Sequence, residues 1–345
     1  MTADLNNQSV LVTGGTGSFG KAFVQSILEH SPNIKRLVIV SRDEQKHHEM
    51  MTELSPATYP ALEYRLGDVR DRDRMIELFR GIDIVVHSAA MKHVPASEMN
   101  PMECVKTNII GSQNVIDAAM ANEVKIVVAL STDKASSPSN FYGASKLCLE
   151  KLFTYADSQK REKNIRFTVV RYANVFGSKG SVIPLFLKKK SQGWLPVTDP
   201  EMTRFSITMD DALDLVYYGI AEGWGGEIIL PISSSYKVGD VATAVAPDAE
   251  QRIIGARAGE KMHESMFTPI IFPVQIIHEV FFCHILVKVN IVKNIKRFNF
   301  IKKAVPGFFE QTDNRYFLNS CIGIFSYNMV IHFHVFVAMI TPVQW

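Results

Sequence analysis

The chain has 345 residues, which allows two domains or one large domain with a cap and excludes a tiny disulfide-stapled fold. Its 37 Lys and Arg against 35 Asp and Glu give a net charge of +2, without the basic field that nucleic-acid binders use. A content of 47% hydrophobic and 21% charged residues is typical of a packed globular protein. We therefore expect a folded protein and no nucleic-acid partner.

The cysteine pattern and the first residues bear on the cellular compartment. The four cysteines form no C-x-x-C pair, and their spacing indicates neither a disulfide framework nor a metal site. Residues 1–9 are polar, and the first apolar run, Val10–Thr13, is only as long as a strand, so we expect no signal peptide. These features predict a cytoplasmic protein that binds no metal.

Short β-branched runs alternate with longer helical patterns between residues 10 and 175. The expected strands are Val10–Thr13, Arg36–Ser41, Leu62–Gly67, Ile82–His87, Val124–Ser131 and Phe167–Arg171. Each run is almost continuously apolar, as strands covered by helices on both faces must be. Helical patterns such as Gly20–Glu29 and Pro101–Asn122 lie between them. The alternation predicts an α/β fold with a Rossmann-like, doubly wound parallel sheet in residues 1–175.

The remainder of the chain changes character twice. Residues 176–270 are punctuated by glycine and proline, which predicts a smaller substrate-binding region. Residues 271–345 hold 11 of the 21 phenylalanines and only three acidic residues, with no steady period, and form an atypical tail. Its stretch Cys321–Ile340 is about long enough to cross a bilayer, although polar side chains interrupt it. Buried strands of the cap and an altered terminus are the alternatives, and we expect no membrane association.

A glycine-rich loop follows the first expected strand. It reads Thr13-Gly14-Gly15-Thr16-Gly17-Ser18-Phe19-Gly20 and leads into the helical run Lys21–Glu29. Gly14, Gly17 and Gly20 let the backbone turn sharply and approach a pyrophosphate, whose charge then lies at a helix N-terminus. The strand–loop–helix order favours a dinucleotide-binding loop over a plain turn.

The end of the second expected strand indicates which dinucleotide is bound. Ser41 can donate to a 2′-phosphate, Arg42 can stack on adenine or pair with that phosphate, and Lys46 follows one helical turn later. These residues favour NADP(H), although Asp43 could turn inward to a ribose and leave NAD open. An exposed, charged helix start is the alternative for Arg42 and Lys46. Further cofactor contacts are expected at the ends of the third and fourth strands, from Asp68, Val69 and Ala89.

Two segments carry the densest chemistry. Leu130–Ala135 (LSTDKA) ends a strand, and Phe141–Lys146 (FYGASK) opens a helix. Tyr142 and Lys146 stand at i and i+4 and therefore share one helix face. Tyrosine is a poor base at neutral pH, but a nearby ammonium and a cationic nicotinamide favour its phenolate. Tyr142 can then remove a hydroxyl proton while Thr132 binds the reacting oxygen. The alternative is an aromatic residue and a lysine on a surface helix.

From about residue 8 to about residue 268, the chain resembles the extended short-chain dehydrogenase/reductase family. More narrowly, it is similar to the inverting UDP-N-acetylglucosamine 4,6-dehydratases that begin pseudaminic acid synthesis. The segments that carry the resemblance are TGGTGSFG, SRDEQK, Gly67–Asp71, Met91–Pro95, STDKA, YGASK, Arg171–Val175 and Arg257–Lys261. The resemblance implies NADP as cofactor, UDP-N-acetylglucosamine as substrate and a homo-oligomer. Beyond Thr268 the chain departs from the family pattern.

The resemblance also gives Asp133 and Lys134 their roles. Dehydratases that retain the C5 configuration have Asp-Glu at these positions, whereas the inverting branch has Asp-Lys. Oxidation of C4 acidifies the C5 proton, so Lys134 would remove it as base while Asp133 protonates the leaving C6 hydroxyl. The enone then takes the hydride back at C6, and C5 is protonated from the opposite face. We expect burial or cations such as Lys92 and Lys146 to help Lys134 lose its proton. A loop ion pair is the alternative.

The same resemblance implies a set of binding residues in the second half of the chain. Near the reacting sugar it implies Lys92 and Asn174, and against the cofactor Val175. The segment expected to line the nucleotide is Lys179, Gly180, Ser181, Val182 and Ile183. The expected diphosphate and ribose contacts are Thr203, Arg204, Arg257 and Glu260.

Two other functions stay open at this point. A UDP-sugar 4-epimerase needs Thr132, Tyr142 and Lys146 but no acid–base pair, so Asp133 and Lys134 argue against it. A non-catalytic NADP-binding module would bind the cofactor without turnover, and the intact tyrosine–lysine pair argues against that.

Overall fold

The structure is a computed structural model, and it describes residues 3–160, 162–177, 182–231, 233, 235–257 and 259–267, with the backbone of 275–277. The expected nucleotide contacts Lys179, Gly180 and Ser181 lie outside these residues. So does the Cys321–Ile340 stretch.

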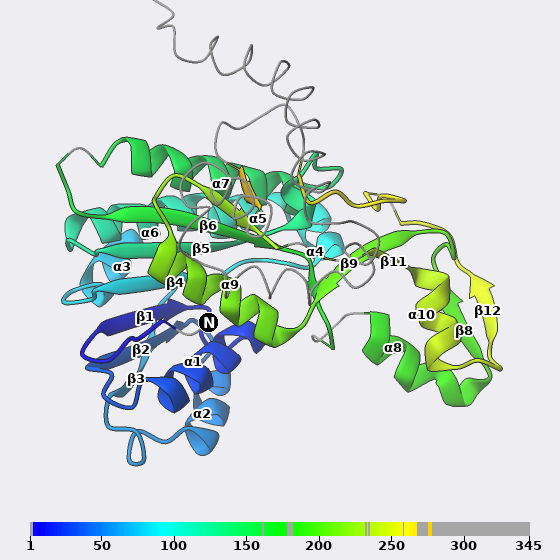
Figure 1. Cartoon of the computed structure of the whole chain (residues 1–345), viewed down its shortest axis with the longest axis horizontal. Helices are drawn as coiled ribbons and strands as arrows, with labels where there is room; N and C mark the ends of the chain where they lie inside the picture. Colours follow the sequence, from blue (N-terminus) through cyan, green and yellow to red (C-terminus); the bar gives the residue numbers. More distant parts are fainter. Residues whose placement is uncertain are drawn as a thin grey trace, which may run out of the picture. The chain divides into compact units, whose positions relative to one another are not determined.

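An eight-stranded sheet, parallel throughout, forms the main body of the described chain (Figure 1). Its strand order is β13-β10-β6-β5-β4-β1-β2-β3. Strands β2 and β3 are added on one side of β1, and β4 and the later strands on its other side, as in a doubly wound fold. The strands are β1 Ser9–Thr13, β2 Arg36–Ser41, β3 Leu62–Leu66, β4 Ile84–His87, β5 Ile126–Thr132, β6 Arg166–Tyr172, β10 Ile228–Leu230 and β13 Gln275–Ile277. The predicted α/β class is confirmed, and each expected strand is found with ends that differ by at most two residues.

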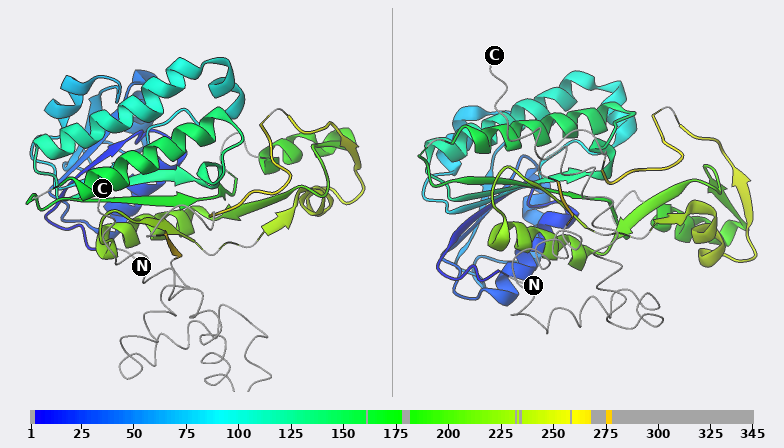
Figure 2. Two further views of the ribbon diagram at one scale, coloured as in Figure 1. Left: turned by 90° about the horizontal axis from the view of Figure 1, so that it is seen from above. Right: turned by 45° about the horizontal axis from the view of Figure 1, so that its top comes forward.

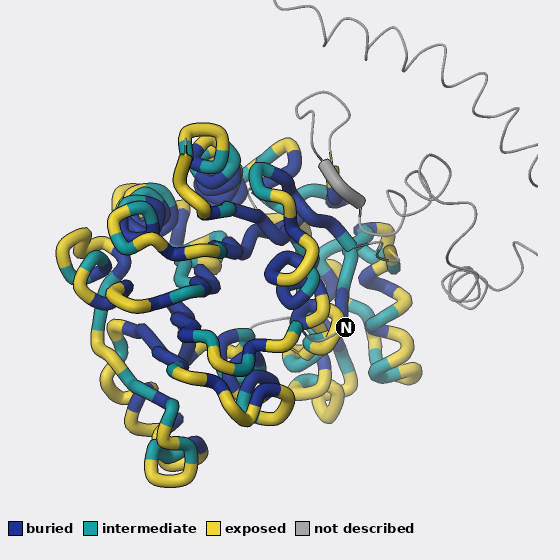
Figure 3. The backbone as a smooth tube through the Cα atoms, turned by 60° about the vertical axis from the view of Figure 1, so that its left-hand side comes forward, coloured by how far each residue is buried: buried dark blue, intermediate teal, exposed yellow. Residues whose placement is uncertain are grey.

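Helices cover both faces of this sheet, which explains why its strands are apolar without interruption. On one face lie α1 Ser18–His30, α2 Glu44–Glu53 and α9 Met209–Glu222, and on the other α3 Arg72–Leu78, α6 Gly111–Ala121 and α7 Phe141–Ser158 (Figure 1). Each layer has its own core: Phe23 and Ile27 pack on the first face, and Leu149 and Phe153 on the second. The central strands are accordingly buried (Figure 3).

The helical pattern expected over 101–122 is not one uniform helix. Helix α4 (Val94–Met99) precedes it, and the segment itself consists of α5 (Pro101–Cys104), a π-helical turn η1 (Val105–Ile110) and α6. π-turns are rare and are frequent at functional sites. Here the turn carries the buried Asn108 toward the loop after β4.

The smaller region lies beside the carboxyl ends of the main strands (Figure 2). Its elements are β7 Asn174–Val175, α8 Val182–Lys189, η3 Lys190–Gln192, β8 Trp194–Val197, β9 Thr203–Ile207, β11 Ser235–Lys237, α10 Val238–Val245 and β12 Glu250–Ile253. Phe186, Leu195 and Val238 belong to its separate core. The chain does not leave the main sheet at residue 175, because α9, β10 and β13 return to it from the second half.

The sheet brings several strand ends to one edge. Thr13 of β1 pairs in register with His87 of β4, and Thr132 of β5 pairs with Tyr172 of β6. The carboxyl ends of a parallel sheet, at the point where the strand order reverses, are where ligands bind in this class of fold. Within the described part of the chain, no helix has both the length and the apolar character needed to cross a membrane.

Candidate active site

The loop between β1 and α1 has the shape that a pyrophosphate requires. Gly14 has φ +68, and a Cβ there would lie 2.8 Å from the backbone of Ala89, so a side chain is excluded. The Gly14 N–H donates to the Val40 carbonyl at 2.8 Å, and the Gly17 N–H to Gly14 at 2.9 Å. Gly17 caps α1 without a side-chain bond, which leaves the N–H groups of the first turn for an anion.

The other residues of the loop fit the same use. Thr16 Oγ1 donates to Ser41 Oγ at 3.0 Å, which ties the glycine loop to the end of β2. Phe19 stacks on Phe23 and Tyr172 with centroid distances of 5.7 and 6.3 Å. Gly20 lies so close to Gly15 that a Cβ would be 2.5 Å from its backbone, which brings α1 hard against the loop. Ser18 is the first residue of α1.

The end of β2 presents arginine rather than a free carboxylate. Asp43 caps α2 by accepting the Lys46 N–H at 3.1 Å, and its carboxylate also pairs with the Lys46 ammonium at 2.9 Å. These bonds occupy the residue that could have turned toward a ribose. Arg42 is exposed, and its guanidinium lies 3.8 Å from the Asp68 carboxylate. Asp68 is held more closely by Arg70, at 2.6 Å.

The catalytic loop begins where β5 ends, with Thr132, Asp133 and Lys134 in the short turn η2 (Asp133–Ala135). One oxygen of Asp133, Oδ1, accepts from Thr132 Oγ1 at 2.8 Å, from the Lys134 N–H at 2.9 Å and from Lys134 Nζ at 3.0 Å. The other oxygen, Oδ2, is buried without a hydrogen-bond partner among the described residues. A buried acceptor in that state is available to a substrate hydroxyl.

The charged neighbours of Lys134 differ from those expected. We expected cations from Lys92 and Lys146, but carboxylates face Lys134: Asp133 at 3.0 Å and Glu264 at 4.0 Å. Lys146 instead donates to the Leu130 carbonyl at 2.8 Å, and Lys92 is exposed after β4. The difference arises because Glu264 comes from a segment distant in sequence.

Tyr142 and Lys146 lie on the buried face of the first turns of α7, as their spacing predicts. Burial raises the pKa of Tyr142, the Asp133 carboxylate raises it further, and a side-chain hydrogen bond with Thr132 opposes both. Burial also lowers the pKa of Lys146 to about 8, against the attraction of Glu150. Both shifts disfavour charge, so the phenolate of Tyr142 needs a positive charge beside it, such as the ammonium of Lys146.

Helix α7 can approach this loop only because of Gly143. A Cβ at that position would overlap the carbonyl of Lys134. Asn140 caps the helix by accepting the Gly143 N–H at 2.8 Å. The cap and the glycine together set the distance between the tyrosine and the Thr132–Lys134 loop.

Sequence analysis did not single out the buried groups that hold α7 in place. Glu150 accepts two bonds from Arg171 of β6, at 2.8 and 2.6 Å, and one from Ser131 of β5 at 2.6 Å. Asn108 bridges the Met91 backbone with bonds of 2.8 and 2.9 Å and donates to Ser145 Oγ at 2.9 Å. The segment Arg171–Val175 carries part of the family resemblance, but only the fold shows that Arg171 pairs with Glu150.

The expected substrate residues fall into two groups. Asn174 accepts from Lys134 Nζ at 3.3 Å and is therefore at the catalytic loop. On β9, the Thr203 hydroxyl bonds to His263 at 2.9 Å, and the Arg204 guanidinium donates to the Met262 carbonyl at 3.3 Å. Arg257 pairs with Glu260 at 3.5 Å and donates its backbone N–H to the same carboxylate at 2.9 Å, and Val182 and Ile183 open α8.

The fold and this site define the class of protein. Residues 10–277 match the family model described as "Polysaccharide biosynthesis protein". The chain belongs to this family of extended short-chain dehydrogenase/reductases, which confirms the predicted resemblance.

Three similar proteins bear on what the chain does. A UDP-N-acetylglucosamine 4,6-dehydratase (inverting) of Campylobacter jejuni is 50% identical over 266 residues, 76% of this chain and 78% of that protein. A UDP-glucose 4-epimerase of Rickettsia canadensis is 40% identical over 75% of this chain and 77% of its own length. The X-ray structure of Pen from Bacillus thuringiensis has a TM-score of 0.73 and 38% identity, and the match covers 76% of this chain and 84% of that one.

The lowered pKa of Lys146 predicts a pH-dependent stability. Between about pH 8 and 10.5 the unfolded chain binds more protons at this lysine than the folded chain, so folded stability rises with pH there. A shift from 10.5 to about 8 corresponds to a cost of about 3 kcal/mol at neutral pH. Denaturant unfolding of Lys146→Met and wild type at pH 7 and pH 10 measures it. We expect Lys146→Met to gain on wild type at pH 7 and to lose most of that gain at pH 10. A stability difference that is the same at both pH values contradicts the assignment.

Proposed function

We propose that this protein is an inverting UDP-N-acetylglucosamine 4,6-dehydratase that uses NADP. The observation that carries the proposal is the acid–base pair of Asp133 and Lys134, joined at 3.0 Å and placed one residue after Thr132. The 50% identity to the inverting dehydratase of Campylobacter jejuni supports it. The product would be a UDP-2-acetamido-2,6-dideoxy-4-keto-hexose with the C5 configuration inverted.

The first step is oxidation of C4. Tyr142 removes the proton of the C4 hydroxyl, and Thr132 binds the same oxygen. The buried ammonium of Lys146, which is three per cent exposed, stabilises the phenolate. When bound, NADP supplies the hydride acceptor for C4 and later the hydride donor for C6.

The second step is loss of water across C5 and C6. The ketone at C4 acidifies the C5 proton. The Asp133–Lys134 pair holds one transferable proton, and moving it from Nζ to the carboxylate gives a neutral amine beside a carboxylic acid. The amine takes the C5 proton, the acid protonates the C6 hydroxyl, the C6–O bond breaks and water leaves. The pair then again consists of an ammonium and a carboxylate.

The third step inverts C5. Hydride adds at C6 of the enone, and a proton reaches C5 from the face opposite Lys134. That proton comes from a donor other than Lys134, because return by the same amine would retain the configuration. The proton that Tyr142 removed from the C4 hydroxyl balances the one delivered to C5, and the Asp133–Lys134 pair stays an ammonium and a carboxylate.

The choice of NADP rests on the end of β2. Ser41 and the exposed Arg42 are available there to a 2′-phosphate, and Asp43 is engaged in capping α2. A guanidinium binds phosphate oxygens in pairs. Lys46, Asp68, Val69, Ala89 and Val175 complete the proposed contacts with the cofactor.

The proposed substrate contacts extend from the catalytic loop to the smaller region. Lys92 and Asn174 would bind the sugar, and Thr203, Arg204, Arg257 and Glu260 the diphosphate and ribose. Lys179 to Ile183 would line the nucleotide. Homo-oligomerisation through helices of the dinucleotide-binding domain and a cytoplasmic location stay predictions.

The second candidate is a UDP-sugar 4-epimerase, favoured by the relatives of that name at 40% identity. An epimerase uses Tyr142, Thr132 and Lys146 in the same way. It has no step that needs an acid and a base at C5 and C6, so variants of Lys134 separate the two functions.

Lys134→Met removes the base and keeps the volume of the side chain. We expect it to oxidise C4 and accumulate the reduced cofactor but to lose no water, because C5 keeps its proton. Tyr142→Phe should block even cofactor reduction, with a fall of about 10²–10⁴-fold. Absorbance of the reduced cofactor and product mass measure the two steps. Water loss by Lys134→Met at the wild-type rate would contradict the role of Lys134 as the base.

Arg42→Ala tests the cofactor. A hydrogen bond to a charged group contributes about 1.5–3 kcal/mol, so the Kd for NADP should rise by about tenfold or more while that for NAD changes little. Arg72→Ala is the matched control, since this exposed arginine pairs with Asp117. Calorimetric titration measures both constants. Equal losses for NADP and NAD would overturn the assignment to Arg42.

A further inference from the structure

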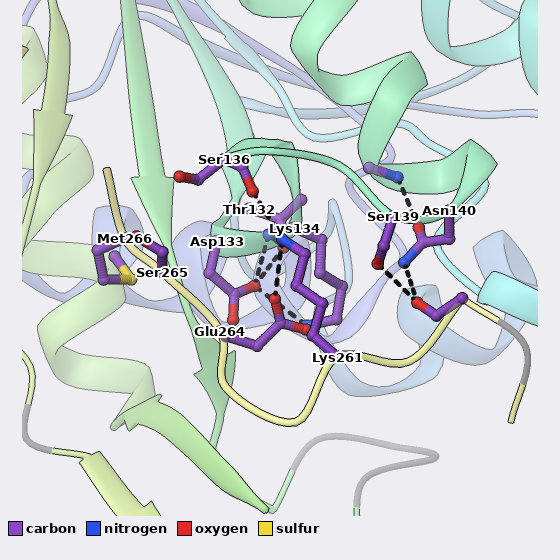
Figure 4. A network of polar contacts seen from close by, with 12 residues as sticks. Thr132, Asp133, Lys134, Ser136, Ser139, Asn140, Lys261, Glu264, Ser265 and Met266 are labelled. Atoms are coloured by element: carbon purple, nitrogen blue, oxygen red, sulfur yellow. Dashed lines mark hydrogen bonds and ion pairs between the residues drawn. The ribbon is translucent and has the colours of Figure 1, made fainter. Parts of the chain in front are cut away.

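Residues 259–267, here called the closing segment, join the catalytic loop to the smaller region (Figure 4). The Gly259 carbonyl accepts from Ser139 Oγ at 2.8 Å and from Asn140 Nδ2 at 3.0 Å. At its other end, the Met266 carbonyl accepts from Arg171 at 2.7 Å. Between these anchors the Thr203 N–H donates to the Met262 carbonyl at 2.9 Å. The segment is thereby fixed against the active site.

The closing segment places one carboxylate between two lysines. Glu264 Oε1 lies 4.0 Å from Lys134 Nζ, and Oε2 lies 3.5 Å from Lys261 Nζ. Lys261 is itself anchored, because its ammonium donates to the Ser136 carbonyl at 2.7 Å. The Glu264 side chain is only 4% exposed, so water screens its charge weakly. Figure 4 shows these side chains pointing toward one another.

The cluster contains two formal negative and two formal positive charges. Asp133 and Glu264 both attract the proton-bearing form of Lys134, whereas Lys261 neutralises part of the field of Glu264. Without Glu264, Lys134 keeps only the Asp133 carboxylate, and without Lys261, Glu264 faces only Lys134. The charge on Lys134 is the one that changes during dehydration.

We propose that Glu264 is a positioning residue for Lys134: it holds the ammonium in place and stabilises the positive charge that Lys134 gains from the C5 proton. Lys261 limits this effect by pairing with the same carboxylate. The inference rests on the proposed dehydratase function and assigns a second carboxylate to its base. Glu264 itself transfers no proton and breaks no bond.

Other titratable groups also face this pair and enter its pH dependence. From η2, the closing segment and α7 these groups are Asp133, Lys261 and Tyr142, which lies beside Asp133. Only Glu264 and Lys261 can be changed without altering the acid, the base or the tyrosine of the proposed reaction. They therefore give the cleanest test.

The test is the pH dependence of water loss in two variants with opposite expected effects. Glu264→Gln removes a negative charge, so the Asp133–Lys134 pair takes up a second proton less readily and the acidic limb of the rate profile moves to lower pH by about one unit. Lys261→Met leaves Glu264 with its full field, so the same limb moves to higher pH. Glu264→Asp keeps the charge and should restore the wild-type profile in part. Glu53→Gln, which breaks an exposed pair with Lys21, is the control and should leave the profile unchanged.

Single-turnover mixing with UDP-N-acetylglucosamine separates the steps. C4 oxidation, read from absorbance of the reduced cofactor, should proceed at near the wild-type rate in both variants and shows that the site is folded. Water loss, read from product mass, should fall by up to about tenfold in Glu264→Gln at neutral pH, because the charge that Lys134 gains is stabilised less. If water loss slows in both variants but the acidic limb does not shift in opposite directions, the residues have a structural role and the inference is overturned. Rate profiles that are unchanged in both variants also overturn it. Absence of the 4-keto-6-deoxy product in wild type would instead count against the proposed function.

Discussion

The ion pair between Glu150 and Arg171 is the interaction on which the geometry of the site depends. Both side chains are at most 2% exposed, and the pair joins α7 to β6 by two hydrogen bonds. Ser131 on β5 and the Met266 carbonyl of the closing segment bond to the same two side chains. Removing one partner of a buried pair costs about 3–5 kcal/mol, because the remaining charge has no counter-charge. The pair therefore holds together β5, β6, α7 and the closing segment, three of which carry or adjoin the groups of the site.

Burial has opposite consequences for the different groups of the site. It raises the pKa of Tyr142 and lowers that of Lys146, so neither charged form is stable without a partner. His87, the last residue of β4, has a pKa lowered to about 3 by burial and bonds to Thr13 at 2.8 Å as a neutral ring. The site thus has buried surroundings in which a few pairs of opposite charges determine which groups hold protons. Acid–base chemistry at C5 and C6 depends on such a balance.

Local spacing predicted the parts of the fold and site whose geometry is local. The strands follow from short, continuous apolar runs, the glycine loop from the order strand, loop, helix, and the shared face of Tyr142 and Lys146 from the helical period of 3.6 residues. The partners of Glu150 and Lys134 could not be found in this way. Arg171 lies 21 residues from Glu150, and Glu264 comes from the other half of the chain, so only the folded arrangement pairs them. Of the two means expected to help Lys134 lose its proton, burial or neighbouring cations, the ion pairs of Lys134 show carboxylates in place of the cations.

The central claim is that Asp133 and Lys134 carry out dehydration with inversion at C5. The measurement that tests it most directly is proton NMR and mass analysis of the product formed from UDP-N-acetylglucosamine and NADP⁺ in D₂O. The account predicts loss of one water, one deuterium at C5 and an inverted C5 configuration. Unchanged mass with a mixture of gluco and galacto sugars would contradict it and indicate a 4-epimerase. A 4-keto product with C5 retained would contradict the role of Lys134.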